Sequence, residues 1–337
     1  MIQSLTPKIF IIIIISALLT SSCINEMEKD KAMSHLKAFD NELVRLIRDI
    51  QRTEAFSSFS MISSINKAPL PFVKDEDRII PGVAYSYDFD YLKGIYELDT
   101  LNMVFEKTGN SDSVIVYFKN PSLNNASVKL IIADYEEKPT SSAFFMPSEI
   151  DMKMFIDNIE VMSIKHHADV QYGYPFELSF YGYFNGYIIT SELNTSLRRK
   201  TALANWNLSV FNNEERIANW KLNAVLNHEA VVYFEEDYAV YNIKKLSMLY
   251  EMYPIKIDVE VNNEAIPVFT NDYVSEFNKH SNIRVFSFNT GKKIGDVKLL
   301  TKERSDKLDY VIYFKDGSYL YIEDLLLSAR RILNIKT

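Results

Sequence analysis

Cysteine is almost absent from this chain, whose 337 residues contain a single one, Cys23. One thiol cannot form an internal disulfide, and it excludes a cysteine-rich zinc site or a redox pair. Positively charged residues are also fewer than negatively charged ones. The chain has 37 lysines and arginines and 45 aspartates and glutamates, which gives a net charge of -8. Nucleic-acid phosphates are recognised by a basic stripe, which this sequence lacks, so we expect no nucleic-acid partner.

Glycine and histidine are scarce as well, with nine and five residues. Neither a phosphate-binding glycine loop nor a glycine-flanked serine elbow occurs. His166 and His167 are neighbours on a predicted strand and therefore point to opposite faces. A zinc-protease pattern that begins at His228 has Val232 in the place of its second histidine. We therefore predict no metal, no cofactor and no catalytic residue.

Long hydrophobic runs are lacking except near the start. Residues 9 to 19 form eleven consecutive positions that are apolar apart from Ser16, directly after Lys8. This run is shorter than the roughly 20 apolar residues that cross a bilayer as a helix. Small residues follow it and lead to Cys23. Residues 1–22 are therefore predicted to be an export signal peptide.

The six residues from Leu18 to Cys23 resemble the lipobox of bacterial lipoproteins, in its looser Bacteroidota form. The usual leucine three places before the cysteine is replaced by Thr20, and Leu19 stands one place earlier. The resemblance implies cleavage before Cys23 and acylation of its thiol. It implies a protein anchored to the membrane by lipid, in the cell envelope at the outer membrane. A soluble exported protein with a chance cysteine, or an uncleaved anchor, are the alternatives.

Acidic residues follow the cysteine at Glu26, Glu28 and Asp30. They loosely resemble the signal that sends Bacteroidota lipoproteins to the cell surface, although two lysines interrupt them. A solvated tether over residues 23–33 explains the same composition equally well. The protein could therefore lie on the periplasmic face of the outer membrane or on the cell surface.

A helical region is predicted over residues 34–66. Its first part carries apolar residues at three- and four-residue steps, which form one helical face, and its second part keeps a three-residue step but is rich in serine. Pro69, Pro71 and Pro81 then indicate a linker over residues 67–82.

Beyond the linker the apolar period changes to two, which indicates strands with one wet face, as in residues 255–261. Amide-rich pairs such as Asp157 with Asn158 mark hairpin turns, and Asp316 with Gly317 is the strongest of these signals. We predict an antiparallel β region over residues 83–269. A C-terminal α+β region follows over residues 270–337, with helices near 271–279 and 322–333. The fold class is α+β, predominantly antiparallel β meanders, with an N-terminal amphipathic helical region and a C-terminal helix.

Aromatic residues are abundant, with 21 tyrosines, 21 phenylalanines and two tryptophans. Tyr85, Tyr87 and Tyr91 alternate along one predicted strand and form a candidate ligand surface, because exposed rings stack on sugars or line lipid sites. Cross-strand packing explains such alternation too. Trp206 and Trp220 are predicted on the core face of one hairpin.

The whole pattern looks like cell-envelope lipoproteins of Bacteroidota. We therefore expect a non-enzymatic binding or structural lipoprotein, whose partners are the membrane and a glycan, lipid or protein ligand. A second hypothesis is a carrier similar to periplasmic lipoprotein-localisation chaperones, with an apolar cavity for acyl chains. A third hypothesis is a glycan-acting hydrolase, which needs clustered carboxylates in a cleft.

Overall fold

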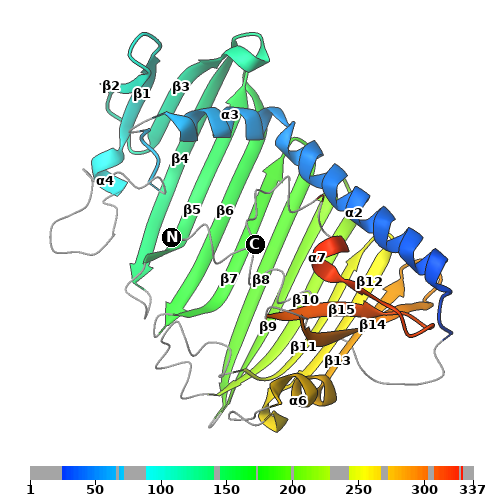
Figure 1. The fold of residues 1–337 in the computed structure, drawn as a ribbon. Coiled ribbons are helices and arrows are strands. Elements are labelled where there is room, and N and C mark those ends of the chain that lie inside the picture. Colours follow the sequence, from blue (N-terminus) through cyan, green and yellow to red (C-terminus); the bar gives the residue numbers. More distant parts are fainter. Residues whose placement is uncertain are drawn as a thin grey trace.

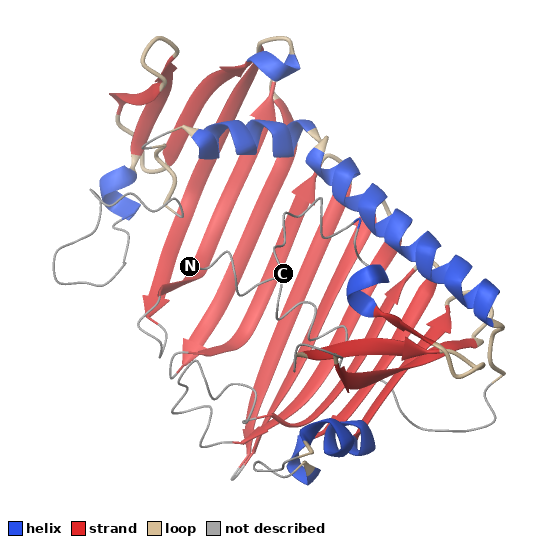
Figure 2. Ribbon diagram, viewed as in Figure 1, coloured by secondary structure: helices blue, strands red, loops and turns tan. Residues whose placement is uncertain are grey.

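The computed structural model describes residues 25–65, 68–71, 89–139, 145–171, 174–198, 201–227, 243–266, 272–302, 307–325 and 328. They form one sheet of 16 strands with two long helices laid across one of its faces (Figures 1 and 2). The helices are α2 (Lys29–Gln51), α3 (Glu54–Ser64), α4 (Phe89–Leu92), α6 (Tyr273–His280) and α7 (Ile322–Leu325), with short 3-10 turns at η3 (Pro121–Leu123) and η5 (Asn263–Ala265).

The strands follow one another across the sheet almost in chain order, and every neighbouring pair is antiparallel except β1 with β3. They are β1 (Gly94–Asp99), β2 (Val104–Gly109), β3 (Val114–Asn120), β4 (Ala126–Pro139), β5 (Phe145–Ile156), β6 (Ile159–Gln171), β7 (Tyr174–Phe184), β8 (Tyr187–Arg198), β9 (Thr201–Asn212), β10 (Glu215–Asn227), β11 (Ile243–Met252), β12 (Ile255–Asn262), β13 (Ser281–Ser287), β14 (Lys293–Thr301), β15 (Leu308–Tyr313) and β16 (Tyr319–Tyr321). The predicted fold class, an antiparallel meander with helices at both ends of the chain, is confirmed.

Short amide-containing turns make this meander because their residues tolerate left-handed backbone. Asp157 and Asn158 join β5 to β6 with φ angles of 47° and 69°, and Asn213 joins β9 to β10 with φ 53°. Gly317, with φ 79°, lies in the turn between β15 and β16. The hairpins predicted at Asp157–Asn158 and at Asp316–Gly317 are both present.

The sheet has an apolar helix face and an opposite polar face. Leu130 pairs with Met154, and Met154 with Met162, so these buried side chains line up on the helix face. Trp206 and Trp220 lie on the same helix face, as predicted. Trp220 is buried, whereas Trp206 is half-buried and donates to Ser191 Oγ over 2.8 Å. Because successive side chains of a strand point to opposite faces, the two-residue period places apolar side chains on the helix face and polar side chains on the opposite face.

Two large hydrophobic cores occupy the helix face, and Phe176 with Ala202 forms a third, small cluster. The α3 core joins α3 to strands β3–β6, with Ile62, Leu130 and Met154 at its centre. The α2 core joins α2 to strands β9–β15, with Leu36, Phe39 and Tyr250 among its buried members. Helices α2 and α3 cross the strands near one end of the sheet, as Figure 1 shows.

The helical region differs from its predicted bounds at both ends and in the middle. The first helix begins at Lys29, inside the stretch predicted as a tether, because the preceding Met27 is buried and donates its N–H to the Lys293 carbonyl over 2.8 Å. The helix then breaks at Thr53, whose Oγ1 accepts the Phe56 N–H and starts α3. Residues 68–71, predicted as linker, are buried.

The predicted division near residue 269 is not a boundary of the sheet, since β12 pairs with β13 along seven residues. Helix α6 lies close to its predicted place, and α7 covers the start of the predicted C-terminal helix. Among the described residues, no helix is long and apolar enough to cross a membrane.

Candidate functional site

Three of the four predicted site residues, Cys23, Tyr85 and Tyr87, lie outside the described part of the chain, and so does His228. Tyr91 is described and is 77% exposed, but it lies on α4, a helical turn, and not on the alternating strand that was predicted. The reason is that Phe89 and Leu92, three residues apart, are both buried on one side of that turn. The described structure therefore leaves Tyr91 as an isolated exposed ring on α4.

The two adjacent histidines point to opposite faces, as predicted. His166 contacts the carbonyl of Pro147 through Nε2 and packs near Phe180 on the helix face. On the polar face His167 makes a short contact through Nδ1 with Glu149. Among the described residues, no group of three His, Cys, Asp or Glu side chains could hold a metal ion.

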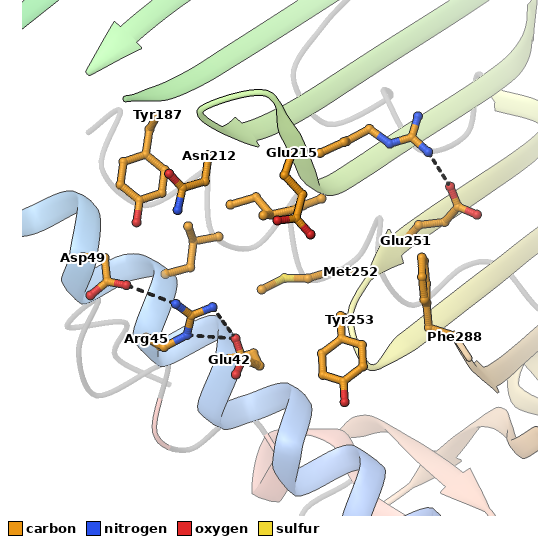
Figure 3. A pocket seen from close by; sticks show the side chains of 14 residues that line it. Glu42, Arg45, Asp49, Tyr187, Asn212, Glu215, Glu251, Met252, Tyr253 and Phe288 are labelled. Atoms are coloured by element: carbon orange, nitrogen blue, oxygen red, sulfur yellow. Dashed lines mark hydrogen bonds and ion pairs between the residues drawn. The ribbon is translucent and has the colours of Figure 1, made fainter. Parts of the chain in front are cut away.

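A cavity of about 470 Å³ lies between α2 and the turns at the nearby end of the strands (Figure 3). Its floor is apolar, formed by Leu46 of α2 and by Ile217, Ala218 and Met252 of the sheet. Its rim is charged and polar. The cavity has the size and the mixed lining of a small-molecule site.

The α2 wall of the cavity is a network around Arg45. Its Nε and Nη2 donate to Glu42 Oε2 over 2.9 and 2.6 Å, and Nη1 donates to Asp49 over 3.4 Å. Three- and four-residue spacings place these side chains on one helix face. The hydrogen bond and charge of Glu42 raise the pKa of Arg45. The Arg45 side chain is 62% exposed, so this network positions groups more than it stabilises the fold.

Tyr187 extends the wall from the first position of β8. It is buried, pairs across strands with Asn212, and follows Gly186, which adopts φ 92° in the turn after β7. Burial raises the pKa of the Tyr187 phenol, and the charge of Asp49 adds to this while Arg45 opposes it. The hydroxyl therefore stays protonated near neutral pH and keeps its capacity to donate a hydrogen bond.

The opposite wall comes from the sheet. Arg216 Nη2 lies 3.8 Å from Glu251 Oε2, and Glu251 also accepts from Asn219 Nδ2 over 3.3 Å. Tyr253 and Phe288 stand at the mouth, 53% and 49% exposed. The Phe288 N–H donates to the Pro254 carbonyl over 2.9 Å, which holds these two turns together.

The chemical character of the cavity is thus amphiphilic: an apolar floor, a rim of carboxylates and guanidinium groups, and rings at the mouth. Such a lining can accommodate a ligand that has one apolar face and polar groups along its edge. Sequence reasoning identified none of these residues as a site. The only local signal was the spacing of Arg45 from Glu42 and Asp49 on a predicted helix.

Two further hollows lie over the polar face. One, of about 500 Å³, includes Tyr181 and the His167 and Glu149 pair. The other, of about 640 Å³, is rich in amides, among them Asn205, Asn223 and Asn282. Each has charged residues in its lining.

Comparisons with protein-family models, with curated proteins and with solved structures give no match for this chain.

Proposed function

We propose that the chain is a lipid-anchored lipoprotein of the cell envelope, held at the outer membrane by acyl chains on Cys23, and that it binds a ligand without transforming it. The sequence around Cys23 supports the anchor. Each buried methylene of an acyl chain contributes roughly 0.8 kcal/mol, so two or three chains hold a protein firmly.

The observation that carries the binding function is the cavity between α2 and the strand ends, with its apolar floor and charged rim. We assign it to a polyhydroxylated ligand, of the glycan class. Three of its four carboxylates, Glu42, Asp49 and Glu251, are already engaged with arginines. This favours binding over hydrolysis, which needs a carboxylic acid that can give up its proton. The carrier hypothesis gains nothing from the three cavities, because each has charged groups in its lining.

The anchor is tested by Cys23→Ser. The variant is expected to lose metabolic labelling by fatty acid and to move from the membrane fraction to the soluble fraction. Ser22→Ala is the matched control and should keep both. A Cys23→Ser protein that is still labelled and still sediments with membranes would contradict lipidation.

The ligand class is tested by probing the mature protein on a glycan array. Tyr253→Ala is expected to weaken binding about tenfold, equivalent to about 1.4 kcal/mol, because a ring at the cavity mouth stacks on the sugar. Tyr117→Ala, which removes a 38% exposed ring on β3, is the control and should bind normally. Absence of any glycan signal, or an equal loss in both variants, would overturn the assignment.

A further inference from the structure

The position at which the described chain begins limits where the proposed lipid anchor can lie. Asn25 is held to the start of β14, where the Lys293 N–H donates to its carbonyl over 3.1 Å. Only one residue separates Asn25 from Cys23, and an extended residue spans at most about 3.6 Å. The α carbon of Cys23 therefore lies within about 7 Å of that of Asn25. Acyl chains on Cys23 bring this end of the sheet to the membrane surface.

The link between Asn25 and the sheet is firm. Lys293 Nζ bridges Glu26 Oε1 at 2.6 Å and Asp296 Oδ2 at 2.8 Å, with only 15% of its side chain exposed. The ring of His35 on α2 lies 3.3 Å from Ser287 Oγ at the end of β13. The first described residues therefore move with the sheet and do not act as a free tether.

Two exposed aromatic rings share this end of the sheet. Phe288 follows directly on Ser287, and its hydrogen bond to Pro254 places the Tyr253 turn next to it. Together Tyr253 and Phe288 form what we call the anchor-side rings. Tyrosine is favoured at membrane interfaces, where its apolar ring meets lipid and its hydroxyl meets water, and phenylalanine supplies an apolar ring to the same layer.

Lysines accompany the rings at the same end. Lys292 is exposed in the turn before β14, and Lys29 and Lys315 have side chains that are 44% and 49% exposed. Lys315 belongs to the neighbouring turn between β15 and β16 and pairs with Glu28. Lys29 in turn lies 3.8 Å from Asp316, so both of these lysines are matched by carboxylates. Rings beside such mixed charges suit the headgroup region of a phospholipid bilayer, which also carries charges of both signs.

We infer that this end of the sheet is a membrane-contact surface, with the anchor-side rings Tyr253 and Phe288 lying in the headgroup region of a phospholipid bilayer. The inference rests on the proposed acylation of Cys23. It also sharpens the ligand class, since Tyr253 and Phe288 form the mouth of the cavity. The cavity then opens at the level of the headgroups, toward a sugar displayed at the membrane surface.

The single cysteine makes the test direct, because an acylated Cys23 leaves no other thiol in the chain. Phe288→Cys is labelled with a polarity-sensitive fluorophore on the acylated protein, in vesicles of phosphatidylethanolamine and phosphatidylglycerol at about three to one. We expect blue-shifted emission that spin-labelled lipids quench several-fold more than the control label. Tyr253→Cys should behave in the same way and guards against a local effect at one site.

The control is Leu308→Cys, which is matched in exposure at 51% but lies at the other end of the strands. Leu308 pairs with Thr301, eight residues along β14 from Lys293, or about 27 Å away. If labels at 288 and 253 show the same emission and the same low lipid quenching as the label at 308, the inference is overturned, while the anchor proposal is unaffected. Protein that does not float with vesicles at all would instead show that the acylation proposal has failed.

Discussion

At the scale of single residues, Asn185 links the sheet to a helix 130 positions away in sequence. It adopts φ 43° in the turn after β7, and its Oδ1 accepts the Ala55 N–H of the first turn of α3 over 2.9 Å. That N–H has no partner inside the helix, because the first turn of a helix leaves its donors unpaired. One side chain thus serves a hairpin and a helix end together.

We predict that Asn185→Ala lowers the free energy of unfolding by about 1–2 kcal/mol, since it removes the acceptor and disfavours the left-handed backbone. Asn185→Asp retains an acceptor for the Ala55 N–H, so it should lose less unfolding free energy than Asn185→Ala. Asn185→Gly also lacks the acceptor but tolerates the left-handed backbone, so its loss should reflect the hydrogen bond alone. Urea unfolding of the three variants measures the order. Equal losses for Ala and Asp would show that the hydrogen bond to Ala55 contributes nothing.

At the scale of elements, the ion pair of Lys293 with Glu26 holds the segment before α2 to β14. Burial lowers the pKa of Lys293, but the hydrogen bonds and charges of Asp296 and Glu26 outweigh it and leave the pKa raised above its usual 10.5. A lysine whose folded pKa is raised stabilises the fold fully below about pH 10.5. That stability is lost as the pH rises through the folded pKa.

Lys293→Met is therefore expected to be less stable than the parent at neutral pH, by about 1–3 kcal/mol for the lost charged hydrogen bonds. The difference should hold between about pH 9 and about pH 10.5 and shrink only above that, as the pH rises through the raised folded pKa and the parent lysine loses its proton. Thermal unfolding of both proteins across this range provides the measurement. Lys292→Met, at the exposed neighbouring position, is the control, and a difference that does not change with pH would refute the ion-pair account.

At the scale of the whole molecule, one continuous sheet carries two large, separate cores. Among the described residues, the buried members of the α2 core and of the α3 core include none from β7 or β8. These middle strands are joined to their neighbours along long hydrogen-bonded registers. Backbone pairing is therefore continuous across two strands that contribute no buried side chain to either large core, and the two halves should open separately.

We predict that Leu130→Ala and Phe39→Ala, each costing about 2–5 kcal/mol, speed amide hydrogen exchange in different halves of the sheet. Leu130→Ala should affect β3–β6, and Phe39→Ala, which removes an edge-on contact with Tyr250 at 6.0 Å between ring centres, should affect β11–β13. Hydrogen exchange read by mass spectrometry resolves the two. Equal acceleration across all strands in both variants would show a single cooperative unit.

Short-range patterns in the sequence determined the class of fold. The alternation in residues 255–261, the amide turns at 157–158 and 213, and the apolar face that holds Leu36 and Phe39 each depend only on neighbours within about four residues. These local signals also sorted Trp206 and Trp220 onto the covered face. Burial overrode local preference at Met27, where a predicted tether became part of the fold, and at Phe89, where a predicted strand became a helical turn.

Only the tertiary structure decided where a ligand could bind. The cavity takes Arg45 from α2, Tyr187 and Arg216 from two strands, and Phe288 from a turn, positions that span more than 240 residues. Local residue spacing cannot predict that these residues lie together, because their proximity depends on how one helix crosses the ends of many strands. The sequence by itself determined a meander, a helix and a lone cysteine. The fold decided that Asn25, two residues from that cysteine, lies at the same end of the sheet as the cavity, because Asn25 pairs with Lys293 at the start of β14.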